Sequence, residues 1–257
     1  MTTAIYYAIP LYIIFFLYGI VIGSFTNVCI YRIPAGESIV RNRSHCTSCG
    51  YQLKWYDLVP LFSYLFLGGK CRKCKAKISL QYPLVETLNG ILYVLIVAVK
   101  GFTPDTLIYC LLASALVTLS VIDFRTYEIP VGINYFILTL GLIHLALHFQ
   151  DWVQYGIGFI AVSGFIWIIF FVSKGRAIGG GDAKLMAAAG LLLGWKLAIF
   201  AFVAGCIYGS VIHIIRMRVT KEGHVLAMGP YLAAGIFTAV MWGESLLRWY
   251  LGLFLNK

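Results

Sequence analysis

The chain has 257 residues, of which 61% are hydrophobic and only 12% are charged, and its mean hydropathy is +0.87. A soluble domain carries roughly 25% charged residues, so the composition excludes an ordinary soluble globular protein. The formal net charge of +10 is compatible with a nucleic-acid partner, but lysine and arginine also gather in the cytoplasmic loops of membrane proteins. We therefore expect a polytopic membrane protein that binds no nucleic acid.

Apolar stretches follow one another along the chain, and several approach the roughly 20 residues that a helix needs to cross a bilayer. We predict an all-α fold with about eight transmembrane helices, at residues 7–30, 83–99, 105–122, 130–148, 153–172, 183–193, 197–215 and 230–253. The stretch 183–193 is too short to cross the membrane alone. We expect a shallow or broken helix there.

One long hydrophilic stretch interrupts this pattern at residues 32–82, which hold nine lysine and arginine residues against two acidic ones. This asymmetry predicts that the stretch, here called the Cys-rich loop, faces the cytoplasm. We divide the chain into a first transmembrane helix (1–31), the Cys-rich loop as a small cytoplasmic domain (32–82) and a larger transmembrane domain (83–257).

The Cys-rich loop contains two Cys-x-x-Cys pairs, separated by 21 residues: Cys46 with Cys49, and Cys71 with Cys74. This spacing is typical of a four-thiolate zinc site resembling a zinc ribbon. Four protein ligands leave no open position, so the metal would be structural. The alternative is a pair of redox-active dithiols or disulfides, which a reducing cytoplasm disfavours. His45 adjoins the first cysteine, but we do not expect it to be a ligand.

Two aspartates stand at the ends of apolar stretches, Asp123 after residues 105–122 and Asp182 before residues 183–193. In the predicted topology both lie at the cytoplasmic end of their helices. Two carboxyl groups held close share one proton, so that one can activate water while the other protonates a carbonyl group. The three glycines before Asp182 (Gly179, Gly180 and Gly181) would let an extended peptide approach the backbone.

Other functions remain open for these residues. Asp182 could be the N-cap of its helix, and Asp123 could pair with Arg125 at the membrane surface. A transporter would use the two acids as a proton or cation relay. A membrane-anchored zinc module that recruits partners would leave them structural.

Several sequence runs in order resemble the bacterial type IV prepilin peptidases, a family of Gly-x-Gly-Asp intramembrane aspartic proteases. They are Gly-Ser-Phe-Thr-Asn-Val-Cys-Ile-Tyr-Arg-Ile-Pro at 23–34, the paired cysteines, Tyr-Pro-Leu-Val-Glu at 82–86, Asp123 with Ile-Pro at 129–130, Gly-Gly-Gly-Asp-Ala-Lys-Leu at 179–185, and Gly-Pro-Tyr at 229–231. The resemblance covers nearly the whole chain.

The resemblance implies that Asp123 and Asp182 are the catalytic aspartates of an endopeptidase in the bacterial inner membrane. Such enzymes cut the short basic leader from prepilins, pseudopilins or competence pilins, after a glycine at the cytoplasmic face. Bacterial members with the Cys-rich loop commonly also methylate the new N-terminus with S-adenosylmethionine. Gly69 and Lys70 are a candidate for that second activity, although an ordinary turn explains them better.

Two further residues belong to the same runs: Glu86 and Lys184. We expect them to tune or position the site without acting as catalysts, and Glu86 fits an ordinary pair between helices equally well. Neither the particular pilin-like substrate nor the oligomeric state follows from the sequence.

Overall fold

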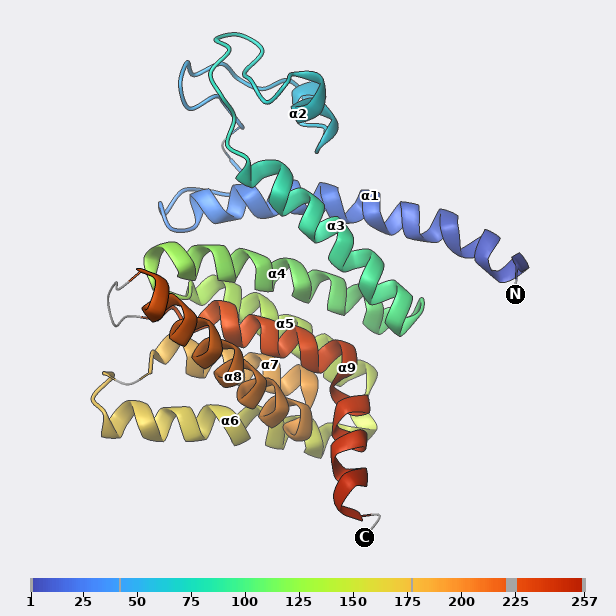
Figure 1. Cartoon of the computed structure of the whole chain (residues 1–257), viewed down its shortest axis with the longest axis vertical. Coiled ribbons are helices and arrows are strands. Elements are labelled where there is room, and N and C mark those ends of the chain that lie inside the picture. Colours follow the sequence, from blue (N-terminus) through green and yellow to red (C-terminus); the bar gives the residue numbers. More distant parts are fainter. Residues whose placement is uncertain (1, 42, 177, 221–225, 256–257) are drawn as a thin grey trace. The chain divides into compact units, whose positions relative to one another are not determined.

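The computed structural model describes residues 2–41, 43–176, 178–220 and 226–255. Within these ranges the chain is helical and contains no β-strand, apart from isolated bridges in the Cys-rich loop (Figure 1). The predicted all-α class is therefore confirmed, as is a cysteine cluster directly after the first helix. The chain divides into two compact units, Met1–Thr118 and Leu119–Lys257.

The first unit is built on two helices that cross, α1 (Thr2–Arg32) and α3 (Gln81–Lys100) (Figure 1). Small residues allow the two backbones to approach. A methyl group added to Gly19 would lie 2.7 Å from the Cα of Gly90, and one added to Gly23 would lie 2.8 Å from the Cα of Glu86. The two glycines of the Gly-x-x-x-Gly pattern in α1 thus lie directly against the backbone of α3.

Buried polar side chains add specific bonds to this unit. The amide of Asn89 on α3 donates to the carbonyl oxygen of Gly19 at 2.7 Å. The hydroxyl of Ser114, on α4 (Pro104–Thr126), donates to the Asn89 side chain at 3.0 Å and also bonds the Tyr93 hydroxyl at 3.0 Å. Because these groups are buried, each of them needs such a partner. They therefore fix the register of α1, α3 and the middle of α4.

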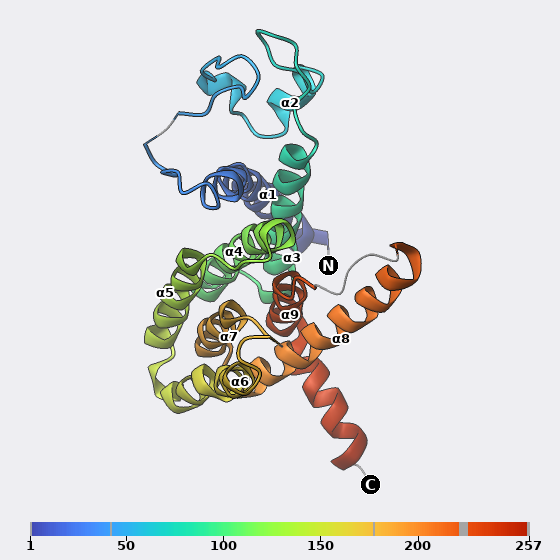
Figure 2. The ribbon, with the colours of Figure 1, turned by 90° about the vertical axis from the view of Figure 1, so that its left-hand side faces the viewer.

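The second unit surrounds one short helix, α7 (Gly180–Leu193). Its neighbours are α5 (Val131–Leu147), α6 (Trp152–Val172), α8 (Trp195–Thr220) and α9 (Gly229–Leu255), and Figure 2 shows α7 between them. Ten of the 14 residues of α7 are buried. A shallow or broken helix is expected from the sequence at residues 183–193, but α7 is one unbroken helix of 14 residues. It can be this short because protein rather than lipid covers most of it.

In this unit the backbones of α6 and α7 approach each other very closely. A methyl group at Gly158 would collide with the carbonyl oxygen of Gly190, and one at Gly190 would collide with that of Gly158. By contrast, a methyl group at Gly156, half a turn away on α6, would meet nothing within 4 Å. The reciprocal contact sets the position of α7 against α6.

Among the described residues, five helical segments are long and apolar enough to cross a membrane: Ile9–Arg32, Gln81–Lys100, Pro104–Thr126, Phe149–Val172 and Trp195–Arg218. The chain is thus a multi-pass membrane protein. All eight predicted stretches coincide with helices, but the count of eight spans is not confirmed. At 1.5 Å per residue, α5 with 17 residues and α7 with 14 are shorter than the bilayer core.

Gly158→Ala should destabilise the second unit by about 1–3 kcal/mol, because the added methyl group overpacks the α6–α7 contact. Gly156→Ala is the matched control in the same helix. It should be neutral or should stabilise the protein by up to about 1 kcal/mol, since alanine is the better helix former. Thermal unfolding of both variants in the same detergent tests this contact, and equal melting temperatures would contradict it.

Candidate active site and cysteine cluster

Asp123 lies in the last turn of α4, which ends at Thr126. Its side chain is only 4% exposed, and its Oδ2 accepts a hydrogen bond of 2.8 Å from the backbone N–H of Gly229. Gly229 is the first residue of α9, and Pro230 follows it, where a missing N–H costs the helix nothing. The partial positive charge of that helix end faces the Asp123 carboxylate.

Asp182 lies in the first turn of α7 and is 7% exposed. The N-cap of this helix is Gly179, so the alternative in which Asp182 itself is the N-cap does not hold. The carboxylate instead reaches back, and its Oδ2 accepts the backbone N–H of Gly179 at 3.2 Å. An acid in this first turn also lies close to the positive end of the helix dipole.

The two aspartates thus come from different helices of the same unit and both face a helix N-terminus. The segment between α4 and α5 packs beside them, because a methyl group at Gly181 would lie 3.0 Å from the Cβ of Ile129. The amide of Asn134 on α5 bonds the carbonyl oxygen of Gly181 at 3.4 Å. The pair is therefore held from several sides.

The three glycines before Asp182 have different surroundings. The N–H of Gly179 donates a hydrogen bond to Asp182, and Gly181 packs against Ile129. The atoms nearest to a methyl group added at Gly180 belong to the side chains of Trp167 and Phe170, at 3.7 Å or more. A substrate-binding role for Gly179, Gly180 and Gly181 stays a prediction.

Sequence reasoning missed the contribution of Gly229 and Asn134. The Gly-Pro pair at 229–230 was visible as part of a family pattern and as a helix start. However, a bond from its backbone N–H to a residue 106 positions earlier has no local signature. Lys184, which the sequence suggested as a positioning residue, is exposed on α7, unlike the buried Asp182.

The Cys-rich loop brings its four cysteines together in two similar hairpins. Cys46 N–H donates to Tyr51 O at 2.9 Å, and Cys71 N–H donates to Ala76 O at 2.8 Å. The fourth residue after each of these cysteines, Gly50 or Lys75, has a positive φ, of 67° and 61°. The two halves of the cluster are therefore built by the same tight turn, although only the first uses the glycine that this conformation favours.

The thiol sulfur atoms of Cys46, Cys49, Cys71 and Cys74 all lie within 4.8 Å of one another. Cys46 Sγ and Cys74 Sγ are 3.8 Å apart. A tetrahedral zinc site with Zn–S bonds of about 2.3 Å requires sulfur atoms separated by about 3.8 Å. All four cysteines are free thiols. The backbone N–H groups of Ser48 and Cys49 lower the pKa of the Cys46 thiol to about 6, which favours the thiolate form that binds metals.

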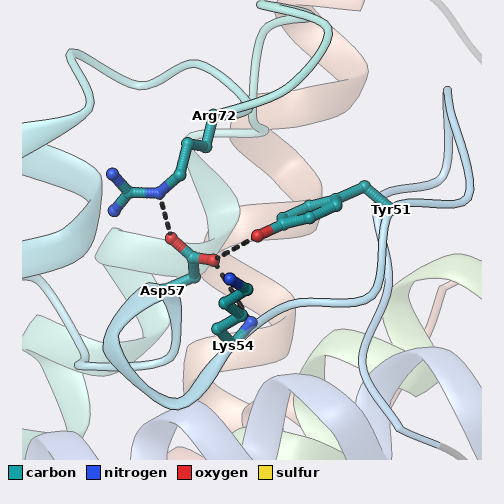
Figure 3. Close-up of polar contacts among 4 residues, drawn as sticks. All are labelled: Tyr51, Lys54, Asp57 and Arg72. Atoms are coloured by element: carbon teal, nitrogen blue, oxygen red, sulfur yellow. Dashed lines mark hydrogen bonds and ion pairs between the residues drawn. The ribbon is translucent and has the colours of Figure 1, made fainter.

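A second polar cluster fastens the two hairpins together, as Figure 3 shows. Asp57 forms an ion pair with Arg72, in which Nε lies 2.7 Å from Oδ1. Its Oδ2 accepts hydrogen bonds from the Lys54 N–H and the Tyr51 hydroxyl. The Arg72 guanidinium lies 4.9 Å from the centre of the Tyr56 ring. Burial opposes ionisation of Asp57, but the bonds from Arg72 and Lys54 outweigh it and hold the pKa of Asp57 below its usual value.

Two other sequence candidates also lie in the first unit. Glu86 is buried in α3, and its Oε2 accepts the Leu61 N–H at 2.8 Å. It therefore fastens the Cys-rich loop to a membrane helix. Gly69 has a φ of +67° and precedes the bridge between Lys70 and Lys77, which supports the interpretation of Gly69 and Lys70 as a structural turn.

Comparison with known proteins adds independent information on both units. The bacterial peptidase A24 N-terminal domain model matches residues 17–100, and the type IV leader peptidase family model matches residues 110–214. The chain is 31% identical to the prepilin leader peptidase/N-methyltransferase of Pseudomonas aeruginosa, over 91% of each chain. It belongs to the type IV leader peptidase family. The resemblance noted in the sequence is thereby confirmed, and the chain is a peptidase.

Two further relatives carry the same name. The chain is 31% identical to the protein from Aeromonas salmonicida, over 93% of this chain and 94% of that one. It is also 31% identical to the protein from Bacillus subtilis, over 95% of this chain and 99% of that one. No solved structure matches the chain.

If Asp123 is catalytic, as the sequence predicts, Gly229→Ala should lower peptidase activity by about 10²-fold, because small displacements of a catalytic group have costs of this order. The added methyl group would lie 2.6 Å from Asp123 Oδ2 and would push the carboxylate away. Gly252→Ala on the same helix, where a methyl group meets nothing within 4 Å, is the control. Leader cleavage by the two variants, at matched membrane levels, decides the point. Unchanged cleavage by Gly229→Ala would show that this N–H does not position Asp123.

Proposed function

We propose that this chain removes the leader of prepilin-like proteins with Asp123 and Asp182 acting as one catalytic dyad. The geometry that supports the proposal is that α4 ends and α7 begins with a buried carboxyl group, each bonded to a backbone N–H at a helix start in the same unit. Among acids in an apolar helical bundle, such a pair is the expected signature of function, because each buried charge is costly.

The chemistry follows from the proximity of the two groups. Two adjacent carboxyl groups in a buried site share one proton, since both cannot carry a charge cheaply. The ionised member takes a proton from a water molecule, which attacks the peptide carbonyl carbon, while the protonated member donates to the carbonyl oxygen. Because the proton belongs to the pair, the acid and base roles are not divided between Asp123 and Asp182.

The backbone N–H groups limit how the dyad can move. Each aspartate keeps one oxygen, Oδ2, on a backbone donor from Gly229 or Gly179. The other oxygen of each carboxyl group is then the one available to water or substrate. This arrangement orients both carboxyl groups before a substrate arrives. Such pre-positioning supplies much of the catalytic effect of reacting groups.

The substrate class comes from the relatives, which are named prepilin leader peptidase/N-methyltransferase. We propose that prepilins, pseudopilins or competence pilins are cut after a glycine, at the cytoplasmic face of the bacterial inner membrane. A substrate with an apolar helix in the lipid and a basic leader outside it places the scissile bond at the end of its span. The positive net charge of the Cys-rich loop supports a cytoplasmic location for that loop.

We propose that the chain also methylates the new N-terminal amine, with S-adenosylmethionine as the methyl donor, as the name of the relatives implies for those proteins. In the Cys-rich loop, Cys46, Cys49, Cys71 and Cys74 would hold a zinc ion. The spacing of the thiols fits this ion, and four thiolates leave it no open position. The ion would stabilise the loop.

Incubation of the detergent-purified protein with a prepilin and S-adenosylmethionine, followed by mass spectrometry of the product N-terminus, tests both activities. We expect a new N-terminus directly after the glycine, carrying one added methyl group. Omitting S-adenosylmethionine should give the same cleavage without the methyl group. Cleavage elsewhere, or an intact prepilin, would contradict the proposed peptidase, whereas cleavage without methylation would remove only the second activity.

The purified protein should contain about one zinc ion per chain, and Cys71→Ser should lose it, because removing one thiolate breaks a closed tetrahedral shell. Cys206→Ser, in α8 and remote in sequence from the cluster, should keep the metal. Elemental analysis of the three proteins measures this directly. A wild-type content below about half an equivalent would count against the four-thiolate site.

A further inference from the structure

The Cys-rich loop exposes large apolar side chains on one short segment. They are Trp55, Leu58, Val59, Phe62, Leu65 and Phe66, here called the apolar patch. Trp55 is 79% exposed and Phe66 is 87% exposed. Three of the six stand at positions i, i+3 and i+4 of α2 (Phe62–Phe66), and therefore on one face of it. Large apolar side chains exposed together indicate a candidate interaction surface.

A shallow hollow with a volume of about 310 Å³ adjoins the apolar patch. Val59, Phe62 and Phe66 line it together with Tyr56 and Arg72. Arg72 uses its Nε on Asp57, and its terminal nitrogens turn away from that carboxylate (Figure 3). An arginine with outward terminal nitrogens beside an apolar surface is suited to a phosphate group.

The contact between Leu61 and Glu86 fixes where α2 begins. Leu61 is the N-cap of α2 and has a φ of 60°, a conformation that leucine rarely adopts. Its N–H donates to Glu86, which lies in the second turn of α3. Since α3 is one of the candidate membrane spans and starts at Gln81, the first residue of α2 lies beside the end of a span. Figures 1 and 2 both show α2 close to the beginning of α3.

The exposed charges that flank the apolar patch in the sequence, within seven residues of it, are all basic. Lys54, Lys70, Arg72 and Lys73 are all exposed, while the nearby acid, Asp57, is buried and bonded to Arg72. Basic groups beside a membrane helix attract anionic lipid headgroups. Tryptophan is also enriched at the interface between lipid and water. Charge and side-chain type therefore match an anionic lipid surface better than a soluble acidic partner, which would leave the six apolar side chains in water.

We propose that the apolar patch inserts into the leaflet next to the start of α3 and anchors the Cys-rich loop to the membrane. The aromatic and aliphatic side chains would lie at the boundary between headgroups and acyl chains, as in interfacial helices. Arg72 and the flanking lysines would face lipid phosphates. The link between Leu61 and Glu86 holds the patch at this depth. This anchor depends on the membrane spans and not on the catalytic dyad.

Photo-crosslinking of the full chain in lipid nanodiscs tests the proposal. p-Benzoylphenylalanine replaces Phe66 in one variant and Thr47, an exposed residue in the first cysteine hairpin, in the matched control. The nanodiscs contain either phosphatidylcholine alone or phosphatidylethanolamine with phosphatidylglycerol. After irradiation, mass spectrometry of the peptides identifies lipid adducts, and intrachain crosslinks are mapped in the same digest.

We expect lipid adducts at position 66 in both nanodiscs, several-fold above those at position 47, with more adduct when phosphatidylglycerol is present. Lys54→Gln combined with Lys70→Gln should remove the preference for phosphatidylglycerol while leaving the adducts with phosphatidylcholine unchanged. Crosslinks from position 66 to another part of the chain would overturn the proposal, because protein would then cover the patch. Equal lipid labelling at positions 66 and 47 would overturn it as well.

Discussion

The cost of burying two carboxyl groups is the constraint on which the rest of the second unit depends. Asp123 and Asp182 are almost completely removed from solvent, and each has one backbone N–H at a helix start as its partner. That solution requires three helix ends to meet: the end of α4 and the beginnings of α7 and α9. The glycines at 179 and 229 are part of it, because a side chain at either position would lie against an aspartate oxygen.

The position of α7 follows from the same constraint. A helix that supplies a buried acid must be enclosed, and ten of its residues are buried among α5, α6, α8 and α9. Close packing without side chains at Gly158 and Gly190 holds it against α6. Rigid placement matters for the proposed chemistry, since a dyad works only while the two carboxyl groups keep their separation and orientation. Packing distant from the aspartates is in this sense part of the site.

The sequence made some of these features predictable and hid others. Acids are rare in apolar helices, so Asp123 and Asp182 could be singled out. The spacing of the cysteines predicted their cluster. The Gly229 N–H, the Gly158–Gly190 contact and the bond from Leu61 to Glu86 could not be foreseen. Each joins residues far apart in the chain through backbone atoms, which every residue carries. The number of spans was likewise uncertain, because apolar character alone does not separate a helix in lipid from one enclosed by protein, as α7 is.

The first unit is held together by a different set of contacts. Its helices meet through glycines and a buried Asn89–Ser114–Tyr93 network, and Glu86 ties the Cys-rich loop to α3. The cysteine hairpins and the Asp57–Arg72 pair give that loop a defined fold. In the proposed anchor, the loop also contacts the lipid directly. In both units, backbone groups supply bonds to buried polar side chains, which lipid cannot do.

The most direct measurement of the central claim is single-turnover cleavage of a prepilin by Asp123→Asn and Asp182→Asn, each reconstituted at wild-type levels. Asp151→Asn, which changes an exposed acid in the connection before α6, is the control. A shared-proton dyad predicts that either of the first two substitutions abolishes cleavage, while both proteins stay folded in the membrane and the control remains active. Full processing of the prepilin by either of them would contradict the account.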